Sequence, residues 1–188
     1  PQKFWGFTNR STAHISWTQH ASAFRDIDSE TEWWDITDWI DKAFYELVTE
    51  DIASGGNCFG MSLESIYARK FKSLFGLPLD GYTWNQAKNE INIKHCYQAG
   101  AEAVYWFLGQ FLTGNTHDPK DVFTRSRSAF NSGRHPVLCV TKNYDFSGAP
   151  HCILPVHWDS SSTPWKIAIC DPNHPGTTKE LTINPGNN

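Results

Sequence analysis

The 188-residue sequence has few of the features that mark metal-binding, nucleic-acid-binding or membrane-spanning proteins. It contains no Cys-x-x-Cys pair and no His-Glu-x-x-His motif, so neither a structural zinc site nor a metalloprotease helix is expected. Its 16 basic residues form no long run and the net charge is −4, which argues against a nucleic-acid partner. No apolar run approaches the roughly 20 residues needed to cross a bilayer. We therefore expect no metal, no cofactor, no nucleic acid and no membrane span.

Flexible apolar residues are also scarce. A single methionine stands against nine tryptophans and twelve phenylalanines, which predicts a core of large rigid rings. With 39% hydrophobic residues the chain is long enough to close one core, so we expect a single domain. It opens at Pro1 and no signal peptide precedes Phe4, which fits a soluble chain that is a mature form or an excised domain of a larger or secreted protein. The compartment and the oligomeric state stay open.

The five cysteines, at positions 58, 96, 139, 152 and 170, are an odd number at irregular spacing. Such a pattern argues against a dense disulfide framework. Cys139, Cys152 and Cys170 each fall inside an apolar run with β character. We therefore expect these three residues to be buried thiols.

The first two thirds of the chain predict helices. Residues 1–30 lack a sustained period and indicate an irregular N-terminal arm before a domain over 31–188. Apolar residues then recur at helical spacing from Ser29 to about Glu50. A second helical region covers roughly Thr83 to Leu112, with a break at Gly100. A third opens at Asp118-Pro119, with aspartate as cap, and closes at Gly133.

The last third changes to short β-rich runs separated by Gly, Asp, Ser, Asn and Pro, a pattern typical of an antiparallel sheet. Helices first and strands afterwards predict an α+β fold, in which an N-terminal helical half packs against a C-terminal antiparallel β-sheet. The four expected strands are 136–141, 151–158, 165–170 and 179–183.

A glycine-rich loop, Ser54 to Gly56, leads through Asn57 into a helical pattern that begins at Cys58. A helix N-terminus carries unpaired N–H groups and a partial positive charge, and both favour a thiolate over a thiol. We expect the helix to extend to about Phe75 and to bury one stripe. The stripe consists of Phe59, Leu63, Ile66, Tyr67, Lys70 through its stem, Phe71 and Leu74.

Two further residues lie where strands begin and end. His151 opens one expected strand, and Asp171 closes the next. If the two strands are antiparallel neighbours joined through 159–163, the start of the first lies beside the end of the second. The carboxylate of Asp171 is then expected to hold Nδ1–H of His151, which leaves Nε2 to face a thiol.

Cysteine at a loop-to-helix junction, then histidine at a strand start and an acid at a strand end, resembles the papain-like cysteine peptidases. The resemblance covers about Ser54 to Ile183. Three motifs carry it: Gly56-Asn57-Cys58-Phe59-Gly60-Met61-Ser62, Pro150-His151-Cys152-Ile153-Leu154-Pro155-Val156 and Ile169-Cys170-Asp171-Pro172-Asn173. The Asp-Pro ending is similar to that of bacteriocin-processing double-glycine peptidases. The resemblance implies a papain-like fold, with Cys58 as nucleophile, His151 as general base and acid, and Asp171 as the orienting residue. Asn173 is the rival for this third role.

One position departs from the family. The oxyanion-hole glutamine usually stands six residues before the cysteine, where this chain has Ile52. The backbone N–H of Cys58 remains one donor. Asn57, Ser54 and the more distant Gln19 are the candidates for the side-chain donor. Losing one such donor typically costs roughly 2.7–4 kcal/mol of transition-state stabilisation.

The resemblance implies acyl transfer through a thioester, with a peptide or protein as substrate. Water as acceptor gives a peptidase or amide hydrolase. An amine or hydroxyl gives an acyltransferase or a transglutaminase-like enzyme, which uses the same order of residues. The remaining alternative is a catalytically inert papain-like module that binds a partner, supported by the missing glutamine and the many tryptophans.

Overall fold

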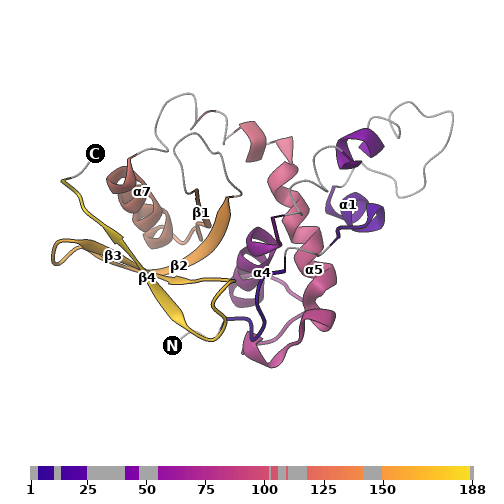
Figure 1. Cartoon of the computed structure of the whole chain (residues 1–188), viewed down its shortest axis with the longest axis horizontal. Coiled ribbons are helices and arrows are strands. Elements are labelled where there is room, and N and C mark those ends of the chain that lie inside the picture. The colour runs from indigo at the N-terminus through magenta and orange to yellow at the C-terminus, as the bar shows by residue number, and fades with distance from the viewer. Residues whose placement is uncertain are drawn as a thin grey trace.

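A computed structural model places helices before strands along the chain (Figure 1). It describes residues 4–10, 14–24, 41–46, 55–101, 103–105, 109, 118–141 and 150–186. The elements are α1 (Trp17–Ala23), α4 (Cys58–Lys70), η2 (Leu79–Gly81), α5 (Trp84–Cys96), η3 (Tyr97–Ala99), α7 (Pro119–Asn131), β1 (Leu138–Val140), β2 (His151–Asp159), β3 (Trp165–Cys170) and β4 (Thr178–Ile183). The expected α+β class is confirmed.

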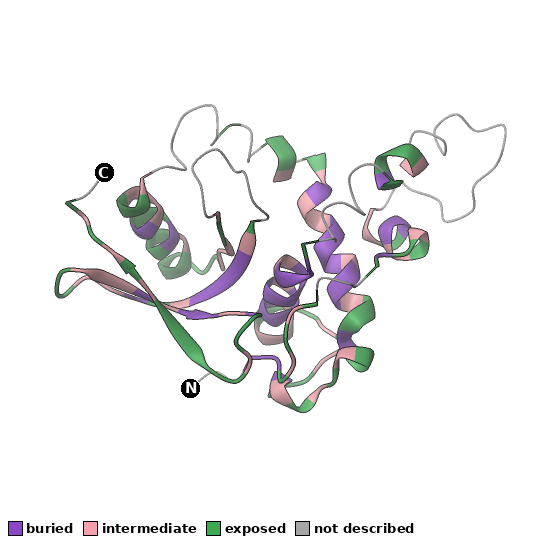
Figure 2. Cartoon of the chain, viewed as in Figure 1, coloured by how far each residue is buried: buried purple, intermediate pink, exposed green. Residues whose placement is uncertain are grey.

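The four strands form one antiparallel sheet in chain order, β1-β2-β3-β4. Apolar side chains of β2 alternate between two clusters. Ile153 belongs to the cluster that contains Phe123 of α7, whereas Leu154 belongs to the cluster that contains Met61 of α4. Figure 2 shows that β2 is largely buried while β4, at the edge, is largely exposed. The expected strands are confirmed, and the sheet is covered by α4 and α7.

Capping residues explain the helices that the sequence predicted. Asp118 accepts hydrogen bonds from the N–H groups of Lys120 and Asp121, and α7 begins with Pro119 as expected. Helix α5 begins after Thr83, and an extended Gly100 interrupts the helical region after η3, as expected. Of the helix expected from Ser29 to Glu50, residues 41–46 are helical, and the other positions lie outside the described residues.

The N-terminal region is more ordered than the sequence predicted. Trp5 is fully buried and its indole N–H donates to the carbonyl of Met61 in α4, so residues 4–10 contribute to the core. Residues 17–23 form α1, which the expectation of an irregular arm over 1–30 missed. The signal for α1 was present in the sequence: Ser16 and Gln19 form a capping box.

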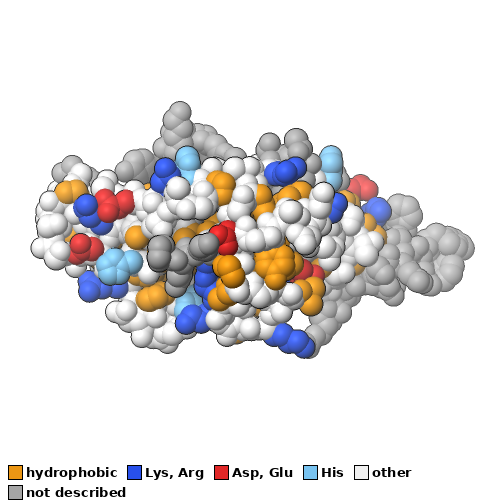
Figure 3. Space-filling model, turned by 90° about the horizontal axis from the view of Figure 1, so that it is seen from below, with side chains coloured by type: hydrophobic (Ala, Val, Ile, Leu, Met, Phe, Trp, Pro, Cys, Tyr) orange, Lys and Arg blue, Asp and Glu red, His pale blue; other side chains and the backbone are white. Residues whose placement is uncertain are grey.

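Helix α4 differs from the expected amphipathic helix in its length and its buried face. It ends at Lys70, and Phe71 and Leu74 of the expected stripe are 64% and 78% exposed. They lie on the stretch between α4 and η2 that leads to α5. Figure 3 shows that hydrophobic side chains reach the surface of the molecule among polar ones. The residues that α4 buries are Cys58, Gly60, Met61, Ser62, Glu64, Ser65 and Ile66. Of the expected stripe only Ile66 is buried, because α4 is enclosed by α5 and β2 and packs against them largely through small and polar residues.

Two contacts bring α5 and β2 close to α4. A Cβ on Gly60 would overlap the carbonyl oxygen of Ile91 in α5, so only glycine permits this approach. On the other side, Ser62 Oγ donates to the carbonyl of Cys152 in β2 over 3.4 Å. The small residues of α4 therefore set the position of its N-terminal end relative to the sheet.

A buried ion pair lies between α4 and α5. Lys94 Nζ is 3.2 Å from Glu64 Oε2 and 3.4 Å from Glu90 Oε2, and the Glu64 side chain is 1% exposed. Oε2 of Glu64 forms no well-aligned hydrogen bond, so charge dominates this contact. Its Oε1 accepts from Ser73 Oγ. Burial acts to lower the pKa of Lys94, but the charges of Glu64 and Glu90 outweigh burial and raise it.

A disulfide joins β1 and β2 through Cys139 and Cys152, which are directly opposite each other in the antiparallel register. Cys58, Cys96 and Cys170 are free and buried. The expectation that Cys139 and Cys152 are buried thiols was therefore wrong, while that for Cys170 is confirmed. Sequence spacing alone does not show which strands are paired, and only the pairing brings these two sulfurs together.

We expect Lys94→Met to lower the free energy of unfolding by about 3–5 kcal/mol, because it leaves the buried carboxylate of Glu64 without a countercharge. Urea denaturation measures this loss. Lys88→Met, at an exposed position of the same helix, is the control and should change stability little. Adding Glu64→Gln to Lys94→Met should recover part of the loss, and a single variant as stable as the parent would contradict the prediction.

Candidate active site

Cys58 is the first residue of α4, and Asn57 is the N-cap residue. The N–H of Cys58 therefore has no acceptor within the helix, as for all first-turn N–H groups. The sulfur lies against the start of β2, because the N–H of Cys152 donates to Cys58 Sγ over 3.3 Å. Residues 58 and 152 are thus adjacent in space, and His151 is the neighbour of Cys152 along the strand.

His151 and Asp171 are joined directly. Nε2 of His151 lies 2.6 Å from Oδ1 of Asp171, and the two side chains are 25% and 14% exposed. The antiparallel pairing of β2 with β3 produces this contact: Leu154 pairs with Cys170, so the residues before Leu154 lie beside the residue after Cys170. The expected proximity of His151 and Asp171 is confirmed.

The two ring nitrogens of His151 have exchanged the partners that the sequence predicted. Nε2, not Nδ1, faces Asp171, which leaves Nδ1 for the hydrogen bond to Cys58. The expectation was wrong because strand order fixes which residues meet but not how the imidazole ring is rotated. In this arrangement the ring bridges the thiol and the carboxylate.

The electrostatics of His151 favour its cationic form. The hydrogen bond to Cys58 raises its pKa most, burial acts in the opposite direction, and the hydrogen bond and charge of Asp171 raise it further. The resulting pKa is about 9. At neutral pH the imidazole therefore carries a proton while it lies between a sulfur and a carboxylate.

Burial affects the thiols of the other two free cysteines. It raises the pKa of Cys96 to about 12 and raises the pKa of Cys170 above its ordinary value, so both thiols stay protonated at neutral pH. Cys139 and Cys152 are oxidised. Among the five cysteines, only Cys58 is a free thiol hydrogen-bonded to a protonated histidine.

The two proposed amide donors that the structure describes face elsewhere. Asn57 is fully buried and its Nδ2 donates to Oδ1 of Asn92 in α5 over 2.6 Å. Gln19 accepts from Asn92 Nδ2 and from the N–H of Ser16, and it donates to Asn89. These amides form one network that links the loop before α4 to α1 and α5. Ser54 and Ile52 lie outside the described residues.

Asn173, the rival of Asp171, does not take the third role. Its side chain is exposed, and it reaches the site only through its backbone N–H, which donates to Oδ1 of Asp171 over 2.8 Å. The nearby His174 lies 3.9 Å from the other carboxylate oxygen. Asp171 is therefore the residue that orients His151.

Sequence reasoning missed Asn9, whose side chain lies against the glycine loop. A Cβ built on Gly56 would be 2.5 Å from Asn9 Nδ2 and 2.7 Å from Oδ1. Gly56 has φ +103°, a conformation that favours glycine, and the N–H of Asn9 donates to the carbonyl of Pro172 over 2.8 Å. No spacing rule links Asn9 to Cys58, and its only sequence signal is its place after the apolar Phe4-Trp5-Gly6-Phe7 segment.

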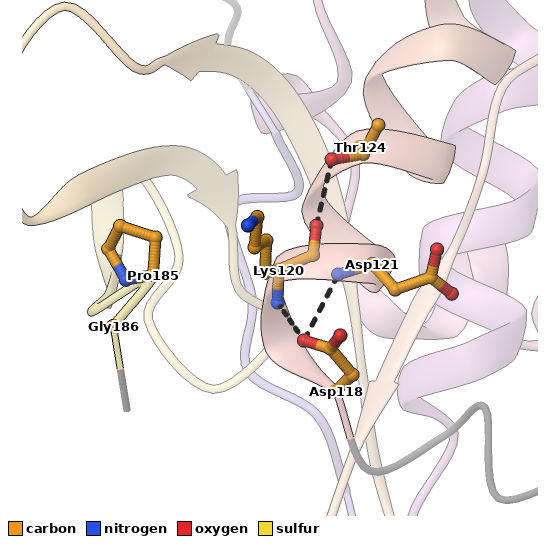
Figure 4. A pocket seen from close by; sticks show the side chains of 6 residues that line it. All are labelled: Asp118, Lys120, Asp121, Thr124, Pro185 and Gly186. Carbon is orange, nitrogen blue, oxygen red and sulfur yellow. Dashed lines mark hydrogen bonds between the residues drawn. The ribbon is translucent and has the colours of Figure 1, made fainter. Parts of the chain in front are cut away.

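A shallow cavity of about 350 Å³ lies at the start of α7 and is separate from these residues. Asp118, Lys120, Asp121, Thr124, Pro185 and Gly186 line it (Figure 4). The carboxylate of Asp118 in this cavity already accepts hydrogen bonds from the first turn of α7, which it caps. Within the described ranges no three metal-ligating side chains gather, and no helix is long and apolar enough to cross a membrane.

The described part of the chain therefore contains a thiol, an imidazole and a carboxylate in one line of contacts, on an α+β scaffold. Comparison with protein-family models, with curated proteins and with solved structures gives no match. Evidence for a function therefore comes only from the arrangement of these three side chains.

We expect NMR titration of His151 to give a pKa of about 9, and Cys58→Ala and Asp171→Asn each to lower it. The folded chain holds this proton more tightly than the unfolded chain, where histidine has a pKa of about 6.5. The stability that the site contributes is therefore fully present below pH 6.5 and is lost as the pH rises through about 9. Urea denaturation across this range measures the loss, and a pKa near 6.5 in the parent would contradict the assignment.

Proposed function

We propose that the chain is a papain-like cysteine peptidase or related amide hydrolase with Cys58, His151 and Asp171 as its catalytic residues. One observation carries the proposal: Cys58 Sγ, at a helix N-terminus, accepts from the N–H of the residue next to His151, and the ring of His151 lies 2.6 Å from Asp171. This is the arrangement of nucleophile, base and orienting group that covalent catalysis requires.

The geometry assigns a role to each atom. Cys58 Sγ attacks the carbonyl carbon of an amide, and the N–H of Cys152 and the cationic His151 stabilise the thiolate before attack. Nδ1–H of His151 then protonates the leaving amine, since Nε2 is held by Asp171. In the second half of the reaction the same nitrogen takes a proton from water, which hydrolyses the thioester.

The raised pKa of His151 has a consequence for the acid step. A general acid must still hold its proton at the working pH, and a pKa of about 9 keeps His151 protonated through the neutral range. Asp171 also prevents rotation of the ring, because its carboxylate binds Nε2 at 2.6 Å. These two effects support acid catalysis by Nδ1.

The five described tryptophans do not support the alternative of an inert binding module. The tryptophans in the described ranges are buried or half-buried, and none is exposed: Trp5, Trp17, Trp84, Trp158 and Trp165. These five therefore form no exposed aromatic surface, and Trp33, Trp34, Trp39 and Trp106 lie outside the described residues. Transfer to an amine instead of water uses the same three residues, so the acyl acceptor has to be identified by experiment.

We expect iodoacetamide to label the non-reduced chain at Cys58, and Cys58→Ala to abolish both the labelling and the cleavage of a peptide library. Mass spectrometry locates the label and detects the products. Cys96→Ala is the control, because burial keeps that thiol protonated, and it should retain labelling and cleavage.

The pH–rate profile tests the mechanism. Activity should fall as the pH rises through about 9, where His151 loses the proton that the leaving amine needs. Adding an amine such as glycine methyl ester separates hydrolysis from transfer by its products. A folded chain that labels at Cys58 but turns over no amide, with or without the added amine, would refute the enzymatic proposal.

A further inference from the structure

The side-chain amide of Asn9 lies at the nucleophile loop without a hydrogen bond. Its Oδ1 is buried and has no partner, and no hydrogen bond of its Nδ2 occurs within the described ranges. Nδ2 is not among the enclosed unpaired atoms, so the donor end of the amide remains accessible. A buried amide oxygen without a hydrogen-bond partner is unfavourable for folding, so Asn9 Oδ1 lowers the stability of the folded chain.

The backbone holds Asn9 firmly in this place. Its N–H donates to the carbonyl of Pro172, the residue after Asp171, over 2.8 Å. Four residues earlier, Trp5 donates to Met61 of α4. Figure 1 shows this indigo segment passing between α4 and the turn that joins β3 to β4. Asn9 is therefore fixed between the loop that precedes Cys58 and the turn that carries Asp171.

The amide of Asn9 lies against the loop that leads into Cys58. Gly56 lies against the amide, and it precedes Cys58 by two residues, which span at most about 7 Å of backbone. Gly56 has no Cβ, and any other residue would displace the Asn9 side chain. The glycine thus provides the space that the amide fills in the loop just before α4.

We propose that Nδ2 of Asn9 is the second donor of the oxyanion hole, paired with the N–H of Cys58. The inference rests on the proposed function and supplies the donor that Asn57 and Gln19, whose amides are bound elsewhere, do not. When Cys58 Sγ bonds to the carbonyl carbon, the C=O π electrons move to the oxygen. Asn9 Nδ2–H and Cys58 N–H then share the negative charge, and both are released when the thioester forms and the amine leaves.

The test is Asn9→Leu, which keeps the branched shape and removes both polar atoms. We expect its kcat to fall roughly 10²- to 10³-fold, as for other oxyanion donors. Alkylation of Cys58 by iodoacetamide creates no oxyanion, so its rate should stay unchanged. Stability to urea should stay equal or rise, because the unpaired buried Oδ1 is gone. Asn85→Leu, at an exposed position of α5, is the matched control and should leave kcat unchanged.

Three outcomes would overturn this role for Asn9. An unchanged kcat in Asn9→Leu shows that Nδ2 does not contact the oxyanion. A parallel loss of alkylation or of stability shows that Asn9 only supports the loop. If the parent chain cleaves no amide, the proposed function fails, and a peptide aldehyde then tests Asn9 separately. The aldehyde adds to Cys58 and forms the same oxyanion, so equal affinity for parent and Asn9→Leu would exclude the donor.

Discussion

The contact between the first turn of α4 and the first residues of β2 is the constraint on which the site depends. The N–H of Cys152 donates to Cys58 Sγ, and its carbonyl accepts from Ser62 Oγ. Both the N–H and the carbonyl of Cys152 are available for these contacts, because the first residue of β2 that pairs with β3 is Leu154. The backbone hydrogen-bonding groups of Cys152, which precedes Leu154, are therefore paired with helix α4 and not with a neighbouring strand.

This constraint also explains the composition of α4. A helix that presents its first turn to a strand edge and its flank to α5 needs small residues on both sides, here Gly60 and Ser62. Large apolar residues at these places would separate α4 from β2 and move the sulfur away from His151. The buried Glu64 and Lys94 satisfy each other at the same interface. The residues that bring Cys58 close to β2 are therefore small or polar, and α4 has no continuous apolar face.

The sequence predicted those parts of the structure that depend on local chemistry or on strand order. Asp118, a residue type that favours the N-cap position, predicted the start of α7. The successive β-rich runs predicted antiparallel strands, and their order alone predicted that His151 and Asp171 would meet. The papain-like fold itself stays a proposal, because no comparison supports or opposes it.

The features that the sequence could not predict depend on packing between distant segments. Strand pairing decides that Cys139 meets Cys152, and ring rotation decides which nitrogen of His151 binds Asp171. The position of Asn9 depends on a backbone hydrogen bond to Pro172, far along the chain. Helical periodicity also misplaced the buried face of α4, since it assumes that a helix faces its core on one side only.

The disulfide between Cys139 and Cys152 gives the chemistry of this chain two opposing redox requirements. Cys58 has to be reduced to act as a nucleophile, whereas its hydrogen-bond donor, Cys152, belongs to a covalent link between β1 and β2. A reductant that reaches both groups protects the first sulfur and breaks the disulfide next to His151. Incubation with dithiothreitol, a routine step for thiol enzymes, would keep the nucleophile reduced while removing the covalent link to β1, and β2 would then be held by its pairing with β3 and its contacts with α4.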